Sequence, residues 1–427
     1  MFRVLNPDVT LYQMRAIKMS VKVESNSWMI ETKGGTLGPL TSYALALWAV
    51  QGLLYPNDIL VHNHHSRARA GALEILHPFI RNNGHLNRAK VWTFASGKGG
   101  VGKSLLSALL GIVLSMKGRK VVIVDGDFDG ANQHELFNIQ KKTPNYWYWL
   151  DKKQPLKSLA LPTGFDNLRL VQGPPSDKGE PSSLSNKIKF ISALRSLDAD
   201  VVLLDLGPRM EYEYLDYFVM ADNNIVVTTP EPTALQNTTA FMKSIFKRKL
   251  ETAAQTLLGK KHPFQLDIQQ NESSILQRSI ELLNQVSLPV TDLIYRSVAS
   301  LNAKVVFNMV DSQTSAPVKQ LKKYVRRDVG ILIDHAGNVR FDPAVRAALQ
   351  KRHLGELVMT FQPIVQDIHH VSGALLQGPN VKQADLRTFT KPLQKATKDV
   401  MCGTWCDSWR DCRFKTPGYP CAVRNMN

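Results

Sequence analysis

One stretch limits the folds open to this chain more than any other: residues 91–104, which read VWTFASGKGGVGKS. The apolar residues up to Ala95 predict a buried strand, the glycines that follow predict a loop, and the apolar-rich residues 105–116 predict a helix. The spacing G-x-x-x-x-G-K-[ST] of phosphate-binding loops is met by Gly97, Gly102, Lys103 and Ser104. The stretch therefore predicts an α/β protein with a phosphate-binding loop, and an ordinary glycine-rich turn is the alternative.

Each part of such a loop has a chemical task in binding a nucleotide. Glycines bring backbone N–H groups close to phosphate oxygens, and the following helix adds free N–H groups and the positive end of its dipole. Lys103 would reach the β- and γ-phosphates, and the Ser104 hydroxyl would be a ligand of Mg²⁺. The loop residues expected to contact the nucleotide are Gly97, Gly99, Gly100, Val101, Gly102, Lys103 and Ser104.

A second lysine, Lys98, lies inside the loop and makes the sequence K-G-G-V-G-K-S. It has no need to bind the loop's own nucleotide, because Lys103 already does so. This arrangement resembles the deviant phosphate-binding loop of the MinD/ParA family of ATPases. The resemblance implies that Lys98 reaches across a dimer interface to the partner subunit's nucleotide, so that ATP, bound with Mg²⁺, closes a homodimer.

An acidic segment follows the next predicted strand, residues 120–125, whose nearly continuous apolar run indicates burial in a parallel sheet. The segment reads DGDFDGANQHELF and is similar to the first switch of the same family, D-x-D-x-x-x-x-N. That resemblance implies that Asp127 orients the attacking water and that Asp125 supports Mg²⁺ through water. It also implies that Asn132 faces the partner subunit's nucleotide. Asp129 is interpreted as a turn residue.

Another buried strand is predicted at residues 199–206, which read ADVVLLDL. Its Asp205 has the form of a Walker B carboxylate, which holds the Mg²⁺ shell. Gly207 would then donate its N–H group near the γ-phosphate. Pro208 and Arg209 stand where the family usually has small residues. Arg209 could contact a phosphate, but we favour a surface position for it.

The rest of the main body repeats a strand-then-helix rhythm, which predicts a mostly parallel, doubly wound sheet with the nucleotide at its carboxyl edge. The segment NIVVTTPEPTAL resembles the family's path past the base and includes Pro230, and Asn308 falls where the family has an adenine-contacting asparagine. The resemblance covers residues 91–376 and is nearest to the branch with the flagellar-number regulators. The further strands and helices are predicted at residues 167–172, 188–197, 224–229, 240–250, 304–309 and 329–333.

The N-terminal part predicts a small α+β domain at residues 28–80, after an extension of residues 1–27 and before a linker of residues 81–90. A strand from Trp28, a turn at residues 33–35, a helix over residues 42–49 and a strand over residues 59–61 are expected. The order Trp28, Gly38-Pro39, Trp48, Gly52, Leu54, Pro56 resembles the bacterial variant of the GYF domain. That family binds proline-rich peptides. An inert cap is the alternative, and the histidines of the last loop are interpreted as solvated: His62, His64 and His65.

The C-terminal tail, residues 377–427, combines a basic segment with all four cysteines. Leu386, Phe389 and Leu393 have helical spacing with lysines on the polar side, as in an anchor for an anionic membrane, although packing on the core is favoured. The thiolates could hold a zinc ion or an iron–sulfur cluster, although their spacing matches neither usual zinc pairs nor ferredoxins. These cysteines are Cys402, Cys406, Cys412 and Cys421.

Composition narrows the partners of the chain. A formal net charge of +17 favours an acidic partner such as DNA, an anionic membrane or a nucleotide, and simple solubility is the alternative. The sequence shows neither a signal peptide nor an apolar run long enough to span a bilayer, so a cytoplasmic protein is expected, at most peripheral at a membrane, pole or nucleoid.

Two functions are therefore expected. The first is an ATP-hydrolysing dimerisation switch that positions or regulates a cellular structure. The alternative is a metal or iron–sulfur carrier or reductase ATPase that uses the cysteine cluster.

Overall fold

The computed structural model describes residues 28–377, except for residues 33–34, 63–65, 78, 81–87, 128–129, 141–144, 146–148, 150–152, 175–183, 209–210, 259–289, 291–292, 295–296, 299–300, 302, 312–315, 330, 332, 352–353 and 361–362. The predicted N-terminal extension and the C-terminal tail with its basic segment and four cysteines lie outside the described residues, as do His64, His65, Asp129 and Arg209.

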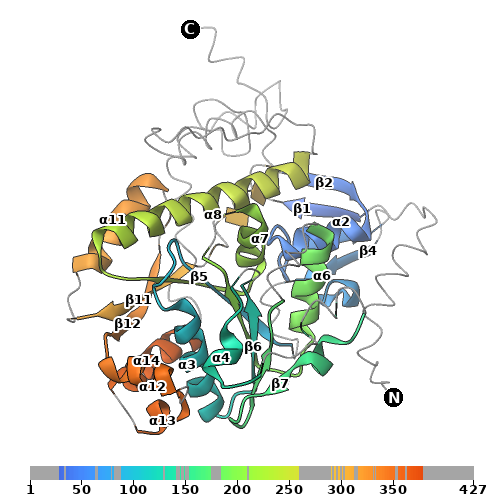
Figure 1. Cartoon of the computed structure of the whole chain (residues 1–427). Helices are drawn as coiled ribbons and strands as arrows, with labels where there is room; N and C mark the ends of the chain where they lie inside the picture. The colour runs from blue at the N-terminus through green and yellow to red at the C-terminus, as the bar shows by residue number, and fades with distance from the viewer. Residues whose placement is uncertain are drawn as a thin grey trace, which may run out of the picture.

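An eight-stranded sheet forms the centre of the molecule (Figure 1). Its strands lie in the order β12-β11-β10-β5-β9-β6-β8-β7, and each neighbouring pair is parallel except β7 with β8. The bounds are β5 (Lys90–Ala95), β6 (Val121–Gly126), β7 (Leu161–Pro162), β8 (Leu168–Val171), β9 (Val201–Leu206), β10 (Asn223–Thr228), β11 (Ala303–Val310) and β12 (Asp334–Arg340). The predicted, mostly parallel sheet is confirmed.

Helices cover both faces of this sheet. One face packs on α3 (Lys103–Met116), α12 (Pro343–Lys351), α13 (Leu354–Met359) and α14 (Pro363–Leu376). The other packs on α6 (Leu184–Arg195), α7 (Tyr212–Met220), α8 (Pro232–Leu258) and α11 (Ala316–Asp328). The central strands are buried on both sides, which explains why their sequences are nearly continuous apolar runs.

A second, smaller sheet lies at the N-terminal end. It is antiparallel, in the order β2-β1-β3-β4, with a helix, α2, and two short 3₁₀ turns, η1 and η2. The bounds are β1 (Trp28–Thr32), β2 (Gly35–Leu40), α2 (Ser42–Val50), β3 (Ile59–His62), β4 (Ser66–Arg69), η1 (Ala70–Ala72) and η2 (Glu74–Leu76). The expected first strand, hairpin and helix are present, and β4 is an additional strand that the sequence analysis did not predict.

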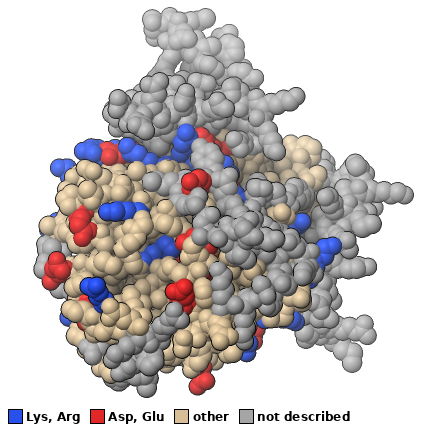
Figure 2. Space-filling view, in the orientation of Figure 1, with Lys and Arg blue, Asp and Glu red and all other residues tan. Residues whose placement is uncertain are grey.

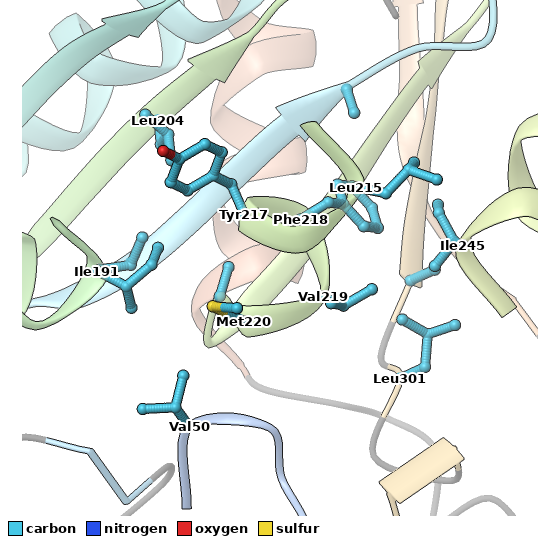
Figure 3. Close-up of a cluster of buried hydrophobic side chains, with 14 of the residues drawn as sticks. Val50, Ile191, Leu204, Leu215, Tyr217, Phe218, Val219, Met220, Ile245 and Leu301 are labelled. Carbon is cyan, nitrogen blue, oxygen red and sulfur yellow. The ribbon is translucent and has the colours of Figure 1, made fainter. Parts of the chain in front are cut away.

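The small sheet unit, residues 28–80, packs against the helices of the main body and shares their apolar core. Figure 3 shows Val50 at the end of α2 in one cluster with Ile191 of α6 and Met220 of α7. Polar contacts reinforce the contact: the Gln51 carbonyl accepts hydrogen bonds from Lys249 Nζ at 3.0 Å and Ser297 Oγ at 3.1 Å. The small sheet unit is therefore attached to the long helix α8 by buried apolar and polar contacts.

The structure corrects one predicted strand and the start of two predicted helices, of which the first, α6, begins at Leu184 rather than at residue 188. Residues 329–333 were expected to form the last strand, but that strand is β12, Asp334–Arg340. Val329, Ile331 and Ile333 are apolar because the connection before β12 is buried, whereas only two side chains of β12 itself are buried. The helix predicted at residues 240–250 is the middle of α8, which begins earlier, at Pro232. Proline is common in the first turn of a helix, where its missing N–H is not needed.

The remaining short elements are α4 (Gln133–Leu136), which directly follows the predicted first switch, and η3 (Leu156–Leu159). Among the described residues, none of the helices combines the length and apolarity needed to traverse a lipid bilayer.

Candidate functional site

The predicted phosphate-binding residues lie at the carboxyl ends of three adjacent strands, β5, β9 and β6. The loop from residue 96 to residue 102 connects β5 to α3. Asp125 of β6 and Asp205 of β9 are paired in register, so their carboxylates meet beside the start of α3. The edge of a parallel sheet where strands end and a helix begins is the usual nucleotide site of such folds.

Two glycines of the loop are required by close contacts. Gly97 lies against α8, where an added Cβ would overlap the backbone of Asn237. Gly102 has φ of 82°, a left-handed conformation that disfavours other residues, and immediately precedes α3. An added Cβ there would overlap the amide of Asn308, whose Nδ2 donates to the Val101 carbonyl at 2.8 Å. The loop is thus held between α8 and β11.

Two charged groups of the site, Lys103 and Asp205, form a buried ion pair. Lys103 Nζ lies 2.5 Å from Asp205 Oδ1, and the exposed fractions of these side chains are 6% and 0%. The same ammonium is 3.5 Å from Ser104 Oγ. Lys103 thus lies at the start of α3, among the groups proposed to bind phosphate and Mg²⁺.

A second buried carboxylate lies next to this pair. Asp125 Oδ2 accepts the backbone N–H of Gln133 at 2.9 Å, and its Oδ1 accepts that of Asp127 at 3.3 Å. Burial, and then the neighbouring Asp205 carboxylate, raise the pKa of Asp125 to about 7. The Asp125 and Asp205 carboxylates have one ammonium, that of Lys103, beside them, so the site favours an additional cation.

This donor set fits Mg²⁺. Carboxylate and hydroxyl oxygens are the ligands that Mg²⁺ prefers, and Asp125, Asp205 and Ser104 bring them to one place beside a phosphate-binding loop. This site offers two carboxylates and a hydroxyl, and no cluster of three or more His, Cys, Asp or Glu side chains suited to a metal occurs among the described residues. His62 instead stacks on Trp28, with ring centroids 4.5 Å apart.

Gln133 was not identified from the sequence, yet its side chain contacts three other residues of the site. It is fully buried, and the two hydrogens of its Nε2 are shared among three acceptors: Asp205 Oδ2 at 2.8 Å, Ser107 Oγ at 2.7 Å and the Ser104 carbonyl at 3.0 Å. A glutamine in a polar segment gives no indication of burial. The one signal in the sequence was the position of Gln133 directly after Asn132.

The predicted first and second switches meet at one point. Asp127 Oδ1 accepts the N–H of Gly130 at 3.0 Å, and an added Cβ on Gly207 would lie 3.0 Å from that same oxygen. The structure therefore brings Asp127 and Gly207 together.

Other predicted residues lie at the rim of the site. Lys98, Gly99, Gly100 and Asn132 are exposed, and Pro230 lies partly buried just after β10, at the same carboxyl edge. Neither Lys98 nor Asn132 is brought to the buried carboxylates. Both are open to contact from outside the chain.

A glycine loop at the start of a helix, with a buried lysine and two carboxylates at the carboxyl edge of a parallel sheet, defines a P-loop nucleotide-binding protein. Residues 92–354 match the family model described as the CobQ/CobB/MinD/ParA nucleotide binding domain, CbiA. The chain belongs to this family.

Curated relatives include an uncharacterised ATP-binding protein of Methanocaldococcus jannaschii, 32% identical over 33% of this chain and 52% of that protein. The flagellum site-determining protein YlxH of Helicobacter pylori is 30% identical over 40% of this chain and 58% of its own length. The chain thus spans between half and three fifths of these relatives. Among solved structures, the cell division ATPase MinD of Pyrococcus furiosus is 16% identical, with 68% of this chain and 99% of that chain covered and a TM-score of 0.47.

Proposed function

We propose that this chain is an ATP-hydrolysing dimerisation switch of the MinD/ParA type, which positions or regulates a cellular structure through ATP-dependent binding to a partner and a surface. The observation that supports it most is the meeting of Lys103, Asp205, Asp125 and Ser104 at the carboxyl edge of the sheet, below the glycine loop. The reaction is the transfer of the γ-phosphoryl group of ATP to water, with ADP and phosphate as products.

The residues around the loop have separate tasks in this proposal. The loop amides of residues 97–104 bind the phosphates, and the Lys103 ammonium turns from Asp205 to the β- and γ-phosphates. Ser104, Asp125 and Asp205 would hold Mg²⁺, which when bound supplies positive charge to the phosphate oxygens. Asp127 accepts a hydrogen bond from the attacking water and thereby orients it, close to the Gly207 N–H group. Pro230 and Asn308 border the base.

Dimerisation depends on the exposed rim. Lys98 and Asn132 are open to a second subunit, and Lys98 would neutralise charge on the partner's nucleotide. The ATP state is then the paired state and the ADP state the single one. Size-exclusion chromatography with light scattering tests this directly: we expect a dimer with Mg²⁺ and a non-hydrolysable ATP analogue and a monomer with ADP. A protein that binds neither nucleotide would refute the proposal.

The surface that the switch binds is proposed to be nucleic acid, through a basic stripe on α11. Its five cations are all exposed and repeat at helical spacing on one face: Lys319, Lys322, Lys323, Arg326 and Arg327. Figure 2 shows Lys and Arg side chains gathered along the edge where α11 and α8 lie. The large apolar residues Leu321 and Val325 are buried against the core. The stripe can therefore neutralise phosphates, but it offers no apolar face to insert into a membrane.

Co-sedimentation separates the two surfaces. The triple variant Lys322→Glu/Lys323→Glu/Arg326→Glu should bind duplex DNA more than tenfold more weakly and with a flatter salt dependence, because each lost phosphate contact lowers the slope by about 0.9. The matched control Arg119→Glu/Lys189→Glu/Arg346→Glu makes the same charge change at exposed positions elsewhere. Equal losses in both variants would point to net charge alone, and binding only to phosphatidylglycerol vesicles would favour a membrane.

A second candidate function comes from the tail. The four cysteines Cys402, Cys406, Cys412 and Cys421 offer enough thiolates for a zinc ion or an iron–sulfur cluster, as a metal-carrier or reductase ATPase requires. Elemental analysis and a visible spectrum of the purified protein test it. Brown protein with labile sulfide favours a carrier, whereas colourless protein with one zinc favours a structural site.

The small sheet unit also has two candidate roles. A GYF-like module would bind a proline-rich protein, and a cap would only cover α8. Burial of Trp48 and the polar contacts of Gln51 to α8 support the cap. Titration of the full chain with proline-rich peptides, monitored by tryptophan fluorescence, distinguishes the two roles, because only a binding module gives a saturable change.

A further inference from the structure

The Gln133 amide has a fixed orientation. Two of its three neighbours, the Asp205 carboxylate and the Ser104 carbonyl, can only accept hydrogen bonds, so the amide nitrogen must face them. The third, Ser107 Oγ, donates its own proton to the Ser104 carbonyl at 2.8 Å and so accepts from Gln133. Chemistry alone therefore places Nε2 on the carboxylate side, and Oε1 away from it.

The two oxygens of Asp205 are thus bound by different donors. Oδ1 contacts the Lys103 ammonium, and Oδ2 contacts the Gln133 amide. The Lys103 contact is the one that changes if this lysine binds phosphates. The Gln133 contact can persist, since Gln133 is anchored at the same time to the backbone and hydroxyl of α3.

Gln133 also joins the second carboxylate to the first switch. Its backbone N–H holds Asp125 Oδ2, and it directly follows Asn132 at the end of the segment that contains Asp127. Gln133 thus contacts both Asp125 and Asp205 and is covalently joined to the end of the first switch. Because Gln133 directly follows Asn132, a movement of the first switch that reached Gln133 would alter its hydrogen bond to Asp205.

The far side of the amide indicates a missing contact. Gln133 is 0% exposed, yet its Oε1 has no hydrogen-bond partner among the described residues. A buried amide oxygen without a donor is unfavourable. A water molecule or another donor brought with a bound nucleotide would satisfy it.

We propose that Gln133 is a positioning residue that fixes the Asp205 carboxylate for Mg²⁺ binding and couples the first switch to it. This inference rests on the proposed nucleotide site and adds a residue to it. Gln133 need not touch the cation. It acts through Asp205, as second-sphere hydrogen bonds do in other metal sites, where their loss costs about 10–100-fold in metal affinity.

The test compares nucleotide binding with and without Mg²⁺ in the full chain, using a fluorescent ADP analogue and titrating Mg²⁺ into the complex. Gln133→Met keeps the size of the side chain and removes the donor. We expect its apparent Mg²⁺ affinity to fall at least tenfold, while its Mg²⁺-free nucleotide affinity stays within about twofold of wild type. Gln51→Met is the matched control, because Gln51 is also buried but lies on the small sheet unit, next to α8.

Gln133→Glu provides a second variant should the methionine variant not fold. It keeps the shape and places a third carboxylate beside Asp125 and Asp205, so we expect Mg²⁺-free nucleotide binding to weaken at least tenfold and Mg²⁺ to restore it. Unchanged Mg²⁺ dependence in a folded methionine or glutamate variant would overturn the proposal. If the wild type binds no nucleotide at all, the proposed function fails instead, so the two failures are distinguishable.

Discussion

Lys103 Nζ and Asp205 Oδ1 lie 2.5 Å apart in the interior, although the two residues are 102 positions apart in the chain. The lysine comes from the first turn of α3 and the aspartate from the end of β9. The pair neutralises two charges that would each be costly to bury alone. In the proposed function, nucleotide binding would exchange this contact for one between Lys103 and phosphate.

The first prediction concerns this pair. Lys103→Met should lower the free energy of unfolding by about 3–5 kcal/mol, because it leaves the buried Asp205 unpaired beside Asp125. It should also abolish nucleotide binding. Chemical denaturation and fluorescent nucleotide titration check the two effects. The double variant Lys103→Met/Asp205→Asn should recover most of the stability and none of the binding; recovery of binding would contradict the assignment of Lys103.

The second prediction separates Lys98 from Lys103. Lys98→Ala should leave nucleotide affinity and the melting temperature near those of the wild type, since its side chain is exposed. It should abolish the dimer that forms with the ATP analogue, as light scattering would measure. A variant that still dimerises would exclude the proposed contact with the partner's nucleotide.

The third prediction tests Asp127. Asp127→Ala should bind ATP but release phosphate at least 100-fold more slowly, because general acid–base and orienting groups typically contribute 10²–10⁴-fold. The ATP dimer should therefore accumulate. A phosphate-release assay gives the rate and light scattering gives the dimer fraction; turnover close to that of the wild type would exclude Asp127 from the reaction.

The fourth prediction concerns stability far from the loop, where Asp222 accepts hydrogen bonds from the Val91 N–H at 3.0 Å and from Arg195 Nη2 at 3.1 Å. Burial alone raises its pKa, but Arg195 and Arg88 outweigh burial and hold the pKa of Asp222 below its usual value. Stability from such a group is present above the unfolded pKa, near 4, and is lost as pH falls through the lower folded value.

Asp222→Asn should therefore unfold more easily at pH 7, by about 1.5–3 kcal/mol, and the difference should narrow as the pH drops below about 4. Denaturant titrations at a series of pH values measure it. Asp198→Asn is the control, because Asp198 pairs with Lys120 in solvent and should contribute little. A difference that did not depend on pH would mean that the charge of Asp222 is not what matters.

The fifth prediction tests the attachment of the small sheet unit. Trp48→Ala should lower the free energy of unfolding by about 3–5 kcal/mol, because Trp48 is buried in the core that this unit shares with α6, α7 and α8. Calorimetry should show a single unfolding transition at a lower melting temperature than in the wild type. Added nucleotide should still raise that melting temperature. Two transitions, of which only one responds to the substitution, would instead indicate an independent module.

The parts of the fold that the sequence predicts well are those where pattern and burial agree. The runs that end in Ala95, Asp125 and Asp205 are buried on both sides, so their nearly continuous apolar sequences predict central strands of the sheet. β12 escaped prediction because it lies at the edge of the sheet and is mostly polar, while the apolar residues before it fill a buried connection.

The site shows the same division. The loop and Lys103 are predicted from spacing, since the glycines and the lysine must be adjacent in sequence to act together. Asp205 is predicted from its place at the end of a buried apolar run. Gln133 could not be found that way, because its importance comes from Ser104 and Asp205, which are distant in sequence and only meet it in the folded chain. The contact between Gln51 and Lys249 was hidden for the same reason.

The course of α8 has a mechanical consequence. Near its start, Asn237 abuts Gly97 so closely that the loop has no room for a methyl group, and nineteen residues later Thr256 donates to Gln51 Oε1 at 2.8 Å. At 1.5 Å per residue these two points are about 29 Å apart along one continuous rod. A shift of the glycine loop on nucleotide exchange would displace α8 near Asn237. Because α8 is continuous from Pro232 to Leu258, the displacement would reach its contact with the N-terminal sheet.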